Sequence, residues 1–235
     1  MAIAFDAVSD GYNNGTSLTF AHTCTGSDRF LVVGIKLYGD NDITGVTYNS
    51  VSMTHIGTAV LAGEGSRAVL YGLTAPSTGA NNIIISRTSS NHILATGASY
   101  TGVSQTGQPE AFGTDADGSS SQTTPAATVV SADAWLVAVG VAAFTGNAFE
   151  AKTATTMRRD NDELVTGTQA TFDSGGTVAT GSQQLAFGQV GNNTGDLAGV
   201  VAVLAPVGAG GDFNPLLLLA SDMRGGMSAM TGGFR

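Results

Sequence analysis

The sequence predicts an all-β protein, built as an antiparallel sandwich of two sheets with a jelly-roll-like path. Charged side chains make up only 11% of the 235 residues, whereas roughly 25% is usual in globular domains. The chain holds 33 glycines, about twice the usual share. Short runs of β-branched and aromatic residues recur along the chain between Gly, Asn, Asp and Ser, which is typical of strands joined by turns. These features exclude a helical bundle and a coiled coil.

The runs predict strands whose ends are set by the nearest turn residues. The expected strands cover residues 3–8, 16–24, 29–38, 43–48, 51–56, 67–73, 82–87, 92–100, 126–131, 134–143, 153–159, 168–173, 180–188 and 197–205. The pairs Asn14-Gly15 and Asn49-Ser50 favour the positive-φ residues of tight hairpins. We therefore expect a hairpin at each of these two places.

Alternation within two strands indicates which side chains form the core. In the strand 29–38 the large side chains share one face, namely Leu31, Val33, Ile35 and Leu37. In the strand 134–143, Trp135, Val137 and Val139 are expected to face the core, opposite Leu136, Ala138 and Gly140. That second face is small and apolar, as are both faces of 197–205. Another sheet, a loop or a neighbouring subunit should therefore cover it.

The chain divides into a β-sandwich domain at residues 1–206 and a Gly-hinged tail at 207–235. Residues 107–125 are rich in Ser, Thr, Gly and Asp, and we interpret them as a surface connection between two groups of strands. In the tail, Asn214 and Pro215 suit the start of a short helix. Such a helix needs a partner surface because it exposes apolar side chains. The predicted partner-binding residues are Leu216, Leu217, Leu218, Leu219 and Met223.

Charge and composition restrict the partners. With 18 acidic and 9 basic side chains the net charge is −9, which repels nucleic acid. The apolar runs are shorter than the roughly 20 residues of a membrane span. No basic cluster precedes Asp6, so we expect assembly in a cytoplasm rather than export. The single cysteine, Cys24, excludes an internal disulfide or a Cys-based zinc site and is expected to be a small buried thiol.

No motif predicts a metal site or a cofactor. The histidines His22, His55 and His92 lie in separate predicted strands without a second ligand at a fixed spacing. Asp115 and Asp117 resemble the start of a calcium loop, but the closing position, 126, is alanine. We interpret both groups as structural.

Catalytic patterns are likewise incomplete, and we predict a protein that is not an enzyme. The stretch 97–101 begins like a nucleophile elbow but lacks its final glycine. The four glutamates are scattered among apparent loops, at Glu64, Glu110, Glu150 and Glu163, so no carboxylate pair for glycoside hydrolysis is indicated. For sugar binding, the candidate loop-edge aromatics are Tyr12, Tyr38 and Tyr48.

Three stretches together resemble a recurring β-sandwich module of bacteriophage virion structural proteins, which is also similar to modules of some bacterial surface proteins. They are residues 45–57, 68–73 with Pro76, and 98–103, and the resemblance spans about residues 3–205. Ser50 stands where glycine commonly completes the Tyr-Asn-Gly turn. The resemblance implies a capsid-decoration or tail-associated subunit, located in the virion and assembled in the host cytoplasm. Its partners would be other virion proteins and copies of itself.

Two other functions remain open. A carbohydrate-binding or adhesin module, displayed on a virion, would bind a cell-surface glycan and should expose aromatic side chains or a cation site. A polysaccharide-degrading enzyme would need two carboxylates in one cleft. The first hypothesis, a non-enzymatic structural subunit whose tail docks on its neighbours, fits the low charge and the leucine-rich tail best.

Overall fold

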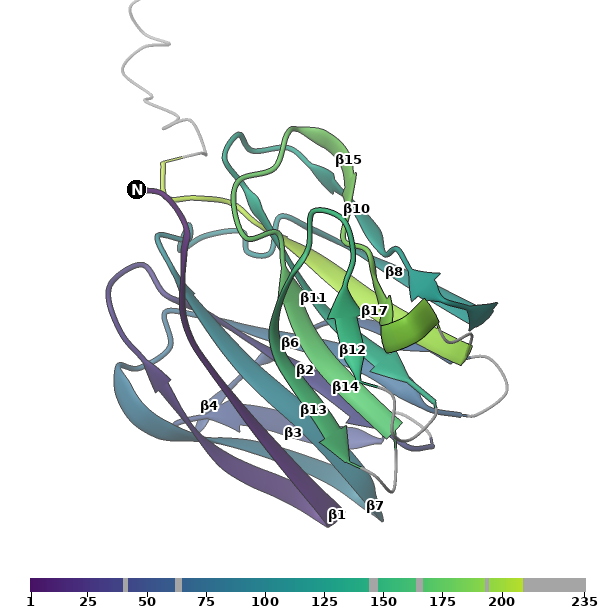
Figure 1. The fold of residues 1–235 in the computed structure, drawn as a ribbon. Coiled ribbons are helices and arrows are strands. Elements are labelled where there is room, and N and C mark those ends of the chain that lie inside the picture. The colour runs from purple at the N-terminus through teal and green to yellow at the C-terminus, as the bar shows by residue number, and fades with distance from the viewer. Residues whose placement is uncertain (40–41, 62–64, 144–147, 164–166, 193–194, 209–235) are drawn as a thin grey trace, which may run out of the picture.

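The structure is a computed structural model that describes residues 1–39, 42–61, 65–143, 148–163, 167–192 and 195–208. Within these ranges it is all-β and antiparallel, and the helical element is one 3-10 turn at Val190–Asn192. The predicted all-β, antiparallel sandwich class is therefore confirmed (Figure 1), with four sheets in the described part of the chain rather than two. The predicted short helix after Asn214 lies outside the described residues.

The strands form one large curled sheet, one five-stranded sheet and two small ones. The large sheet, ordered β4-β3-β7-β2-β6-β5 with β1 beside β7, contains β1 (Ala4–Cys24), β2 (Phe30–Leu37), β3 (Ile43–Tyr48), β4 (Val51–Ser52), β5 (Thr54–Val60), β6 (Arg67–Thr74) and β7 (Gly79–Thr101). The five-stranded sheet, ordered β13-β14-β11-β17-β8, contains β8 (Ala111–Ser120), β11 (Trp135–Ala142), β13 (Thr156–Glu163), β14 (Gly167–Asp173) and β17 (Gly195–Leu204). The small sheets are β12 (Phe149–Ala151) with β16 (Phe187–Gln189) and β9 (Gln122–Thr123), and β10 (Ala126–Val129) with β15 (Gly181–Gln184).

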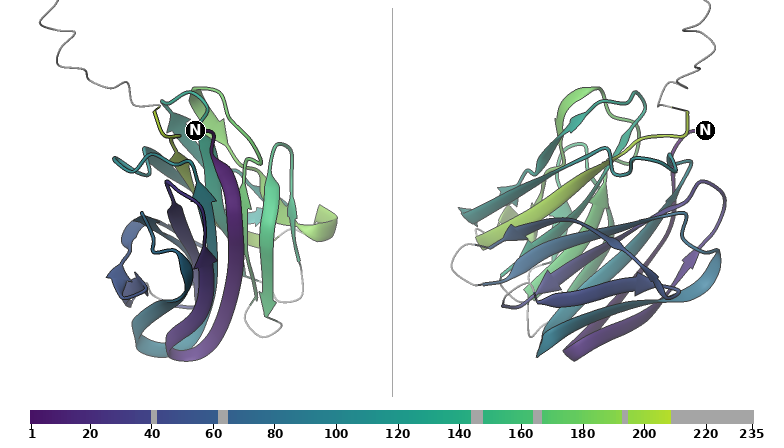
Figure 2. Two further views of the ribbon diagram at one scale, coloured as in Figure 1. Left: turned by 90° about the vertical axis from the view of Figure 1, so that its left-hand side faces the viewer. Right: turned by 180° about the vertical axis from the view of Figure 1, so that it is seen from behind.

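Strands β1 and β7 form one long ribbon that folds over on itself. Their ladder runs from Ala4 opposite Thr101 to Gly15 opposite Asn91, and then resumes at Ser17 opposite Ser86. The ladder skips one residue of β1 and four of β7, and the ribbon bends there. Figure 2, left, shows the purple and teal ribbons curving at the foot of the molecule.

The bend corrects the predicted hairpin at Asn14-Gly15. Asn14 pairs with His92 of β7 rather than closing a turn between two neighbouring strands. The chain does reverse, because Ser9 Oγ lies 2.8 Å from His22 Nδ1 across the bend. The two halves of β1 therefore face each other in different layers, and each half pairs with β7. The hairpin predicted at Asn49-Ser50 is confirmed, since Tyr48 pairs with Val51.

The fold-over gives four layers with three apolar cores between them. The first layer holds β4, β3, the first half of β7 and the second half of β1. The second holds β5, β6, β2 and the remaining halves, the third is the five-stranded sheet, and the fourth is the two small sheets. Representative core residues are Leu31, Ile83 and Ile93 between layers one and two, Phe30, Trp135 and Val200 between two and three, and Leu136, Phe172 and Phe187 between three and four.

Both faces of the central strands are covered by this chain itself. Trp135, Val137 and Val139 face the second core, as predicted, and Trp135 is 8% exposed. The opposite face of β11 packs on Phe187, and a Cβ built on Gly140 would lie 2.5 Å from that ring. The small apolar face thus has its covering sheet, the fourth layer.

The surface connection predicted at 107–125 is wrong in part. Residues 111–120 form β8, which pairs with β17 at the edge of the third layer. Its Ser, Thr, Gly and Asp content suits an edge strand with one side open to water, and pairing with a buried neighbour overrides its low strand propensity. This segment does join the two groups of strands.

Candidate functional site

Both ends of the described chain lie together at one end of the layers (Figure 1). The amino nitrogen of Met1 donates to the carbonyl oxygen of Val207 at 3.4 Å. The backbone N–H of Val207 donates to the carbonyl of Gly102 at 2.9 Å, and Val103 forms a bridge with Pro206. The point from which residues 209–235 continue is therefore fixed to the sandwich.

A hollow of about 650 Å³ lies beside this point. It is lined by Met1, Ala2, Ala132, Asp133, Thr177, Pro206, Val207 and Gly208. Most of these residues are small or apolar, and the Met1 side chain is 71% exposed. Asp133 supplies the only charged side chain of the lining. The hollow suits apolar side chains of a docking segment and offers neither a nucleophile nor an acid and base pair.

The predicted partner-binding residues of the tail lie outside the described residues. Leu216, Leu217, Leu218, Leu219 and Met223 all follow Gly208, the last described residue. The structure thus describes the point of attachment and the hollow, and the tail contacts remain a prediction.

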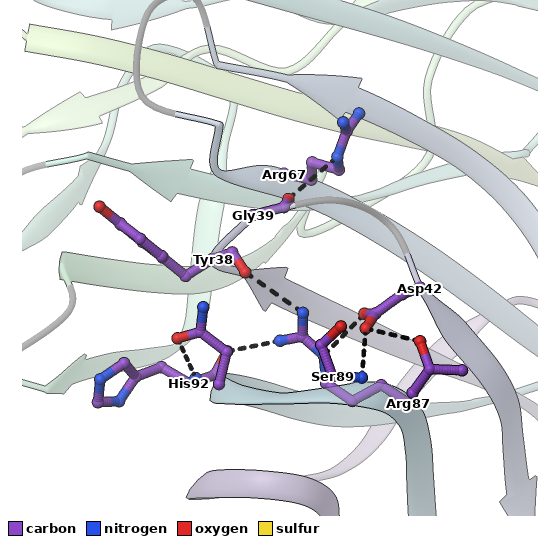
Figure 3. A network of polar contacts seen from close by, with 9 residues as sticks. Tyr38, Gly39, Asp42, Arg67, Arg87, Ser89 and His92 are labelled. Atoms are coloured by element: carbon purple, nitrogen blue, oxygen red, sulfur yellow. Dashed lines mark hydrogen bonds and ion pairs between the residues drawn. The ribbon is translucent and has the colours of Figure 1, made fainter.

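A polar network holds the opposite end of the layers, near the bend (Figure 3). Arg87 Nε donates to Asp42 Oδ1 at 2.7 Å, and the same guanidinium reaches the carbonyls of His92 and Tyr38. Asp42 Oδ2 accepts from the backbone N–H of Ser89 at 2.7 Å. Burial opposes ionisation, but the hydrogen bonds from Ser89, Arg87 and Thr88 lower the pKa of Asp42 to about 2. The network connects chain segments at this end of the layers, and its charged groups form hydrogen bonds with one another and with the backbone. We therefore interpret it as structural.

The three predicted loop-edge aromatics differ in their exposure to solvent. Tyr38 is exposed, at 45%, and Tyr12 is half-buried, with its hydroxyl 2.8 Å from His92 Nδ1. Tyr48 is fully buried, and that prediction is wrong. Its hydroxyl oxygen lies 3.3, 3.2 and 3.1 Å from the carbonyl oxygens of His22, Ser77 and Gly79, any one of which can accept its single proton. Of these three rings only that of Tyr38 is exposed, and one such ring is a weak platform for a sugar.

The predicted metal and thiol candidates are dispersed. His22 is buried beside Ser9, His55 contacts Thr58 at 2.9 Å on the surface, and His92 pairs with Tyr12. Burial lowers the pKa of His22 to about 4, against a small opposing effect of the Asp6 carboxylate. Cys24 is fully buried and free, as predicted, and burial raises the pKa of its thiol.

Asp115 holds a turn by accepting from the N–H of Thr124 at 2.7 Å. In the part of the chain that the structure describes, no group of three His, Cys, Asp or Glu side chains converges as metal ligands do.

The catalytic candidates are also separate. Ser99, in the incomplete elbow motif, is fully buried in β7 and donates to Asp6 at 2.8 Å. Glu110 accepts the backbone N–H groups of Val130 and Ser131, and Glu150 pairs with Lys152. Glu64 and the side chain of Glu163 lie outside what the structure describes.

Besides Arg87, the sequence reasoning missed two charged side chains that are almost fully buried. Asp173 is fully buried and accepts hydrogen bonds from Tyr100 at 3.0 Å and from Arg158 at 2.5 Å. Lys36 is 1% exposed, and its Nζ donates to the carbonyl of Ala142 at 2.5 Å. Lys36 lies on the face of β2 opposite Ile35, which packs in the first core, and that face is covered by the third layer. Only the tertiary pairing of distant strands reveals these partners.

No family model matches the chain, and neither a curated protein nor a solved structure matches it significantly. Among the described residues, no helix has the length and apolar character needed to cross a bilayer. The function is therefore inferred from the chain's own residues.

Proposed function

We infer that this protein is a non-enzymatic structural subunit of a phage-like virion, either a capsid-decoration or a tail-associated protein, whose residues 207–235 join it to neighbouring subunits. The observation that carries the proposal is the fixed attachment at Val207, where the N–H bond to Gly102 and the contact of Met1 lock the start of the tail to the sandwich. A partner that binds residues 209–235 would therefore be connected to the sandwich through the bond between Val207 and Gly102.

The rest of the molecule supports this role. The described residues enclose three apolar cores, and the ion pairs Arg87–Asp42 and Arg158–Asp173 are held within the fold. The hollow beside the attachment point is large enough for two or three aliphatic side chains. Burying one leucine contributes roughly 1.5–3 kcal/mol. Docking of several tail leucines, in this hollow or on another virion protein, would offset the ordering of a short peptide.

The test is a chain truncated after Gly208, which keeps the bond between Val207 and Gly102. We expect the shortened protein to unfold at the same denaturant concentration as the full chain. When it is produced with the other particle proteins and the particles are purified on a density gradient, we expect it to be absent from them. A matched variant of the full chain, Leu217→Asp with Leu218→Asp, should show the same loss.

Either of two results would refute the proposal. The truncated protein could be incorporated with unchanged occupancy, or the full chain could fail to enter any particle. The expected lack of catalysis is checked by incubating the full chain with polysaccharide and peptide panels. Turnover that is lost in Glu110→Gln or Glu150→Gln would show an enzyme instead.

A further inference from the structure

The outer face of the first layer carries no charge. Its four strand segments, residues 17–24, 43–48, 51–52 and 79–86, contain no Asp, Glu, Lys or Arg. On β7 the inward side chains Ile83 and Ile85 fill the first core, so Asn82 and Ile84 point outward. The chain has a net charge of −9, whereas the strand segments of this face are uncharged. Its outward residues are mainly Ser, Thr, Asn, Ala and Gly.

A hollow of about 300 Å³ lies on this face. It is lined by Asn49, Ser50, Ala80, Asn81, Asn82 and Ile84. Asn49 and Ser50 form the two-residue turn between β3 and β4, with φ of 48° and 64°. The backbone N–H of Asn49 donates to the carbonyl of Asn82 at 3.1 Å, which fixes the turn against β7. The outward Asn82 and the turn residue Asn49 thus lie at a fixed wall, and Asn81 completes the lining.

These carboxamides keep hydrogen-bonding capacity for a ligand. Asn49 Nδ2 donates to Ser77 Oγ at 3.1 Å. The NH₂ group of Asn81 is engaged within the protein, with the carbonyls of Thr78 and Gly79 and the Tyr48 hydroxyl at 3.2, 3.4 and 3.4 Å. Within the described part of the chain, no hydrogen bond engages the Oδ1 atoms of Asn49 and Asn81 or the side chain of Asn82. Each free carboxamide offers both donors and acceptors.

The chemistry of the lining selects a neutral polyhydroxylated ligand. Adjacent hydroxyl groups of a sugar both donate and accept, as carboxamides and the Ser50 hydroxyl do. Ile84 and Ala80 supply an apolar floor for the C–H face of a sugar ring. The lack of charged side chains gives no advantage to an anionic or cationic ligand. A volume of about 300 Å³ is at the lower end for ligand sites and fits one or two sugar residues.

The size of the face argues against a second copy of the chain as its main occupant. Four strands about 4.8 Å apart and eight residues long at about 3.3 Å each give at most about 500 Å². A stable protein interface needs about 800 Å² per partner. A sugar chain crossing the strands needs far less area.

We propose that the hollow formed by Asn49, Ser50, Asn81 and Asn82 binds a residue of a neutral polysaccharide. This proposal does not depend on the structural role inferred above, because the hollow belongs to the first layer and involves neither terminus. In a virion subunit it would attach the particle to neutral glycan.

The test uses ¹⁵N-labelled full-length protein titrated with four neutral hexasaccharides, namely maltohexaose, cellohexaose, xylohexaose and mannohexaose, and with an anionic alginate hexasaccharide. We expect at least one neutral probe to shift the side-chain NH₂ signals of Asn49 and Asn82. The variant Asn82→Leu should weaken that binding about tenfold, as expected for the loss of one or two neutral hydrogen bonds. Asn14→Leu, an exposed asparagine at the bend, is the control and should bind normally.

Three outcomes would overturn the proposal. The first is that no neutral probe shifts the NH₂ signals of Asn49 and Asn82. The second is that the alginate probe binds at the hollow as tightly as the neutral probes do. Alternatively, sedimentation could show that the protein self-associates through this face and that Ala21→Lys abolishes the association. The last result would assign the face to a second copy.

Discussion

The hydroxyl of Tyr100, on β7 of the second layer, donates to the carboxylate of Asp173, on β14 of the third layer, at 3.0 Å. Both side chains are fully buried. Burial and the neighbouring Asp173 carboxylate raise the pKa of Tyr100 well above its usual range, so the phenol stays protonated and keeps donating. This bond and the Arg158 ion pair form one of the polar links between these two layers, beside the Lys36 bond to Ala142 and the contact of Gln169 with Thr96.

Replacing Arg158 by alanine tests this link. The substitution leaves the Asp173 carboxylate buried with less compensation, and we expect a loss of about 3–5 kcal/mol in the free energy of unfolding. The neighbouring Arg159 is the matched control, because its pair with Asp10 at 2.8 Å is largely exposed. Arg159→Ala should cost less than about 1 kcal/mol. Equal losses in urea unfolding of the two variants would contradict the assignment.

A second prediction concerns Trp135, which packs edge-on against Tyr100 with ring centroids 6.2 Å apart. Trp135→Ala should cost roughly 3–5 kcal/mol, because it leaves a cavity between the second and third layers. The chain has one tryptophan, so fluorescence reports on this site alone. Iodide should quench the folded protein weakly. Quenching as strong as in the unfolded chain would show that the indole is not in the core.

The position of Trp135 could be predicted because alternation along a strand is a local property. Large side chains at every second residue of 134–143 mark one face, and the small apolar residues between them require a close cover. The same reasoning identified Cys24 as a buried thiol. The identity of the cover, Phe187 and its sheet, depends on pairing between distant strands and left no signal in either segment.

A third prediction concerns the fold-over of β1. A Cβ built on Gly11 would lie 2.9 Å from Phe20 Cδ1 on the opposite half of the strand. Gly11→Ala should therefore cost about 1–3 kcal/mol through overpacking. The control is Gly45→Ala, since nothing lies within 4 Å of its Cβ, and it should be neutral or slightly stabilising. In a Phe20→Ala background the cost of Gly11→Ala should fall, and an unchanged cost would contradict the fold-over.

The fold-over itself was not predictable from Asn14-Gly15. That pair favours a reversal of the chain, and a reversal does occur there. A hairpin and a bent ribbon differ only in which strand satisfies the backbone hydrogen bonds, and here β7 does so for both halves. Tyr48 was misjudged for a related reason. Its hydroxyl lies among three carbonyl acceptors, one on β1 and two where the chain enters β7, and no local pattern shows this.

A fourth prediction concerns pH. Burial lowers the pKa of His22 from 6.5 to about 4, so the unfolded chain binds more protons between these values. Stability contributed by the neutral imidazole is present above about pH 6.5 and is lost as the pH falls towards 4. The loss reaches on the order of 3 kcal/mol. The Asp42 carboxylate affects stability at lower pH than His22 does. Its pKa is lowered to about 2, so its contribution to the free energy of unfolding is lost only below about pH 4.

Urea unfolding at intervals between pH 7 and pH 4 measures this effect. His22→Gln should flatten the slope of stability against pH in that range. His55→Gln should leave it unchanged, since His55 is exposed and bonded only locally to Thr58. A slope that persists in His22→Gln would assign the titration to other groups.

The candidate sites show the limit of sequence reasoning in another way. The tail leucines stand out because apolar residues follow glycines in a polar segment, and this can be read directly. The asparagine hollow combines a turn at 49–50 with a strand beginning at 79. Only the ladder between β3 and β7 brings them together, so no spacing in the sequence indicates it.

The ladder between β1 and β7 also determines the order in which the protein can fold. Cys24 pairs with Gly79 and Ala4 with Thr101, so β1 has no partner strand in this ladder until residues 79–101 have been made. Such distant pairing makes folding slow. Once residue 101 has emerged, however, the first core is complete, while the outer side of β2 and its Lys36 still lack the third layer. The nascent chain therefore passes through a half-built state whose open apolar face awaits β11 and β17.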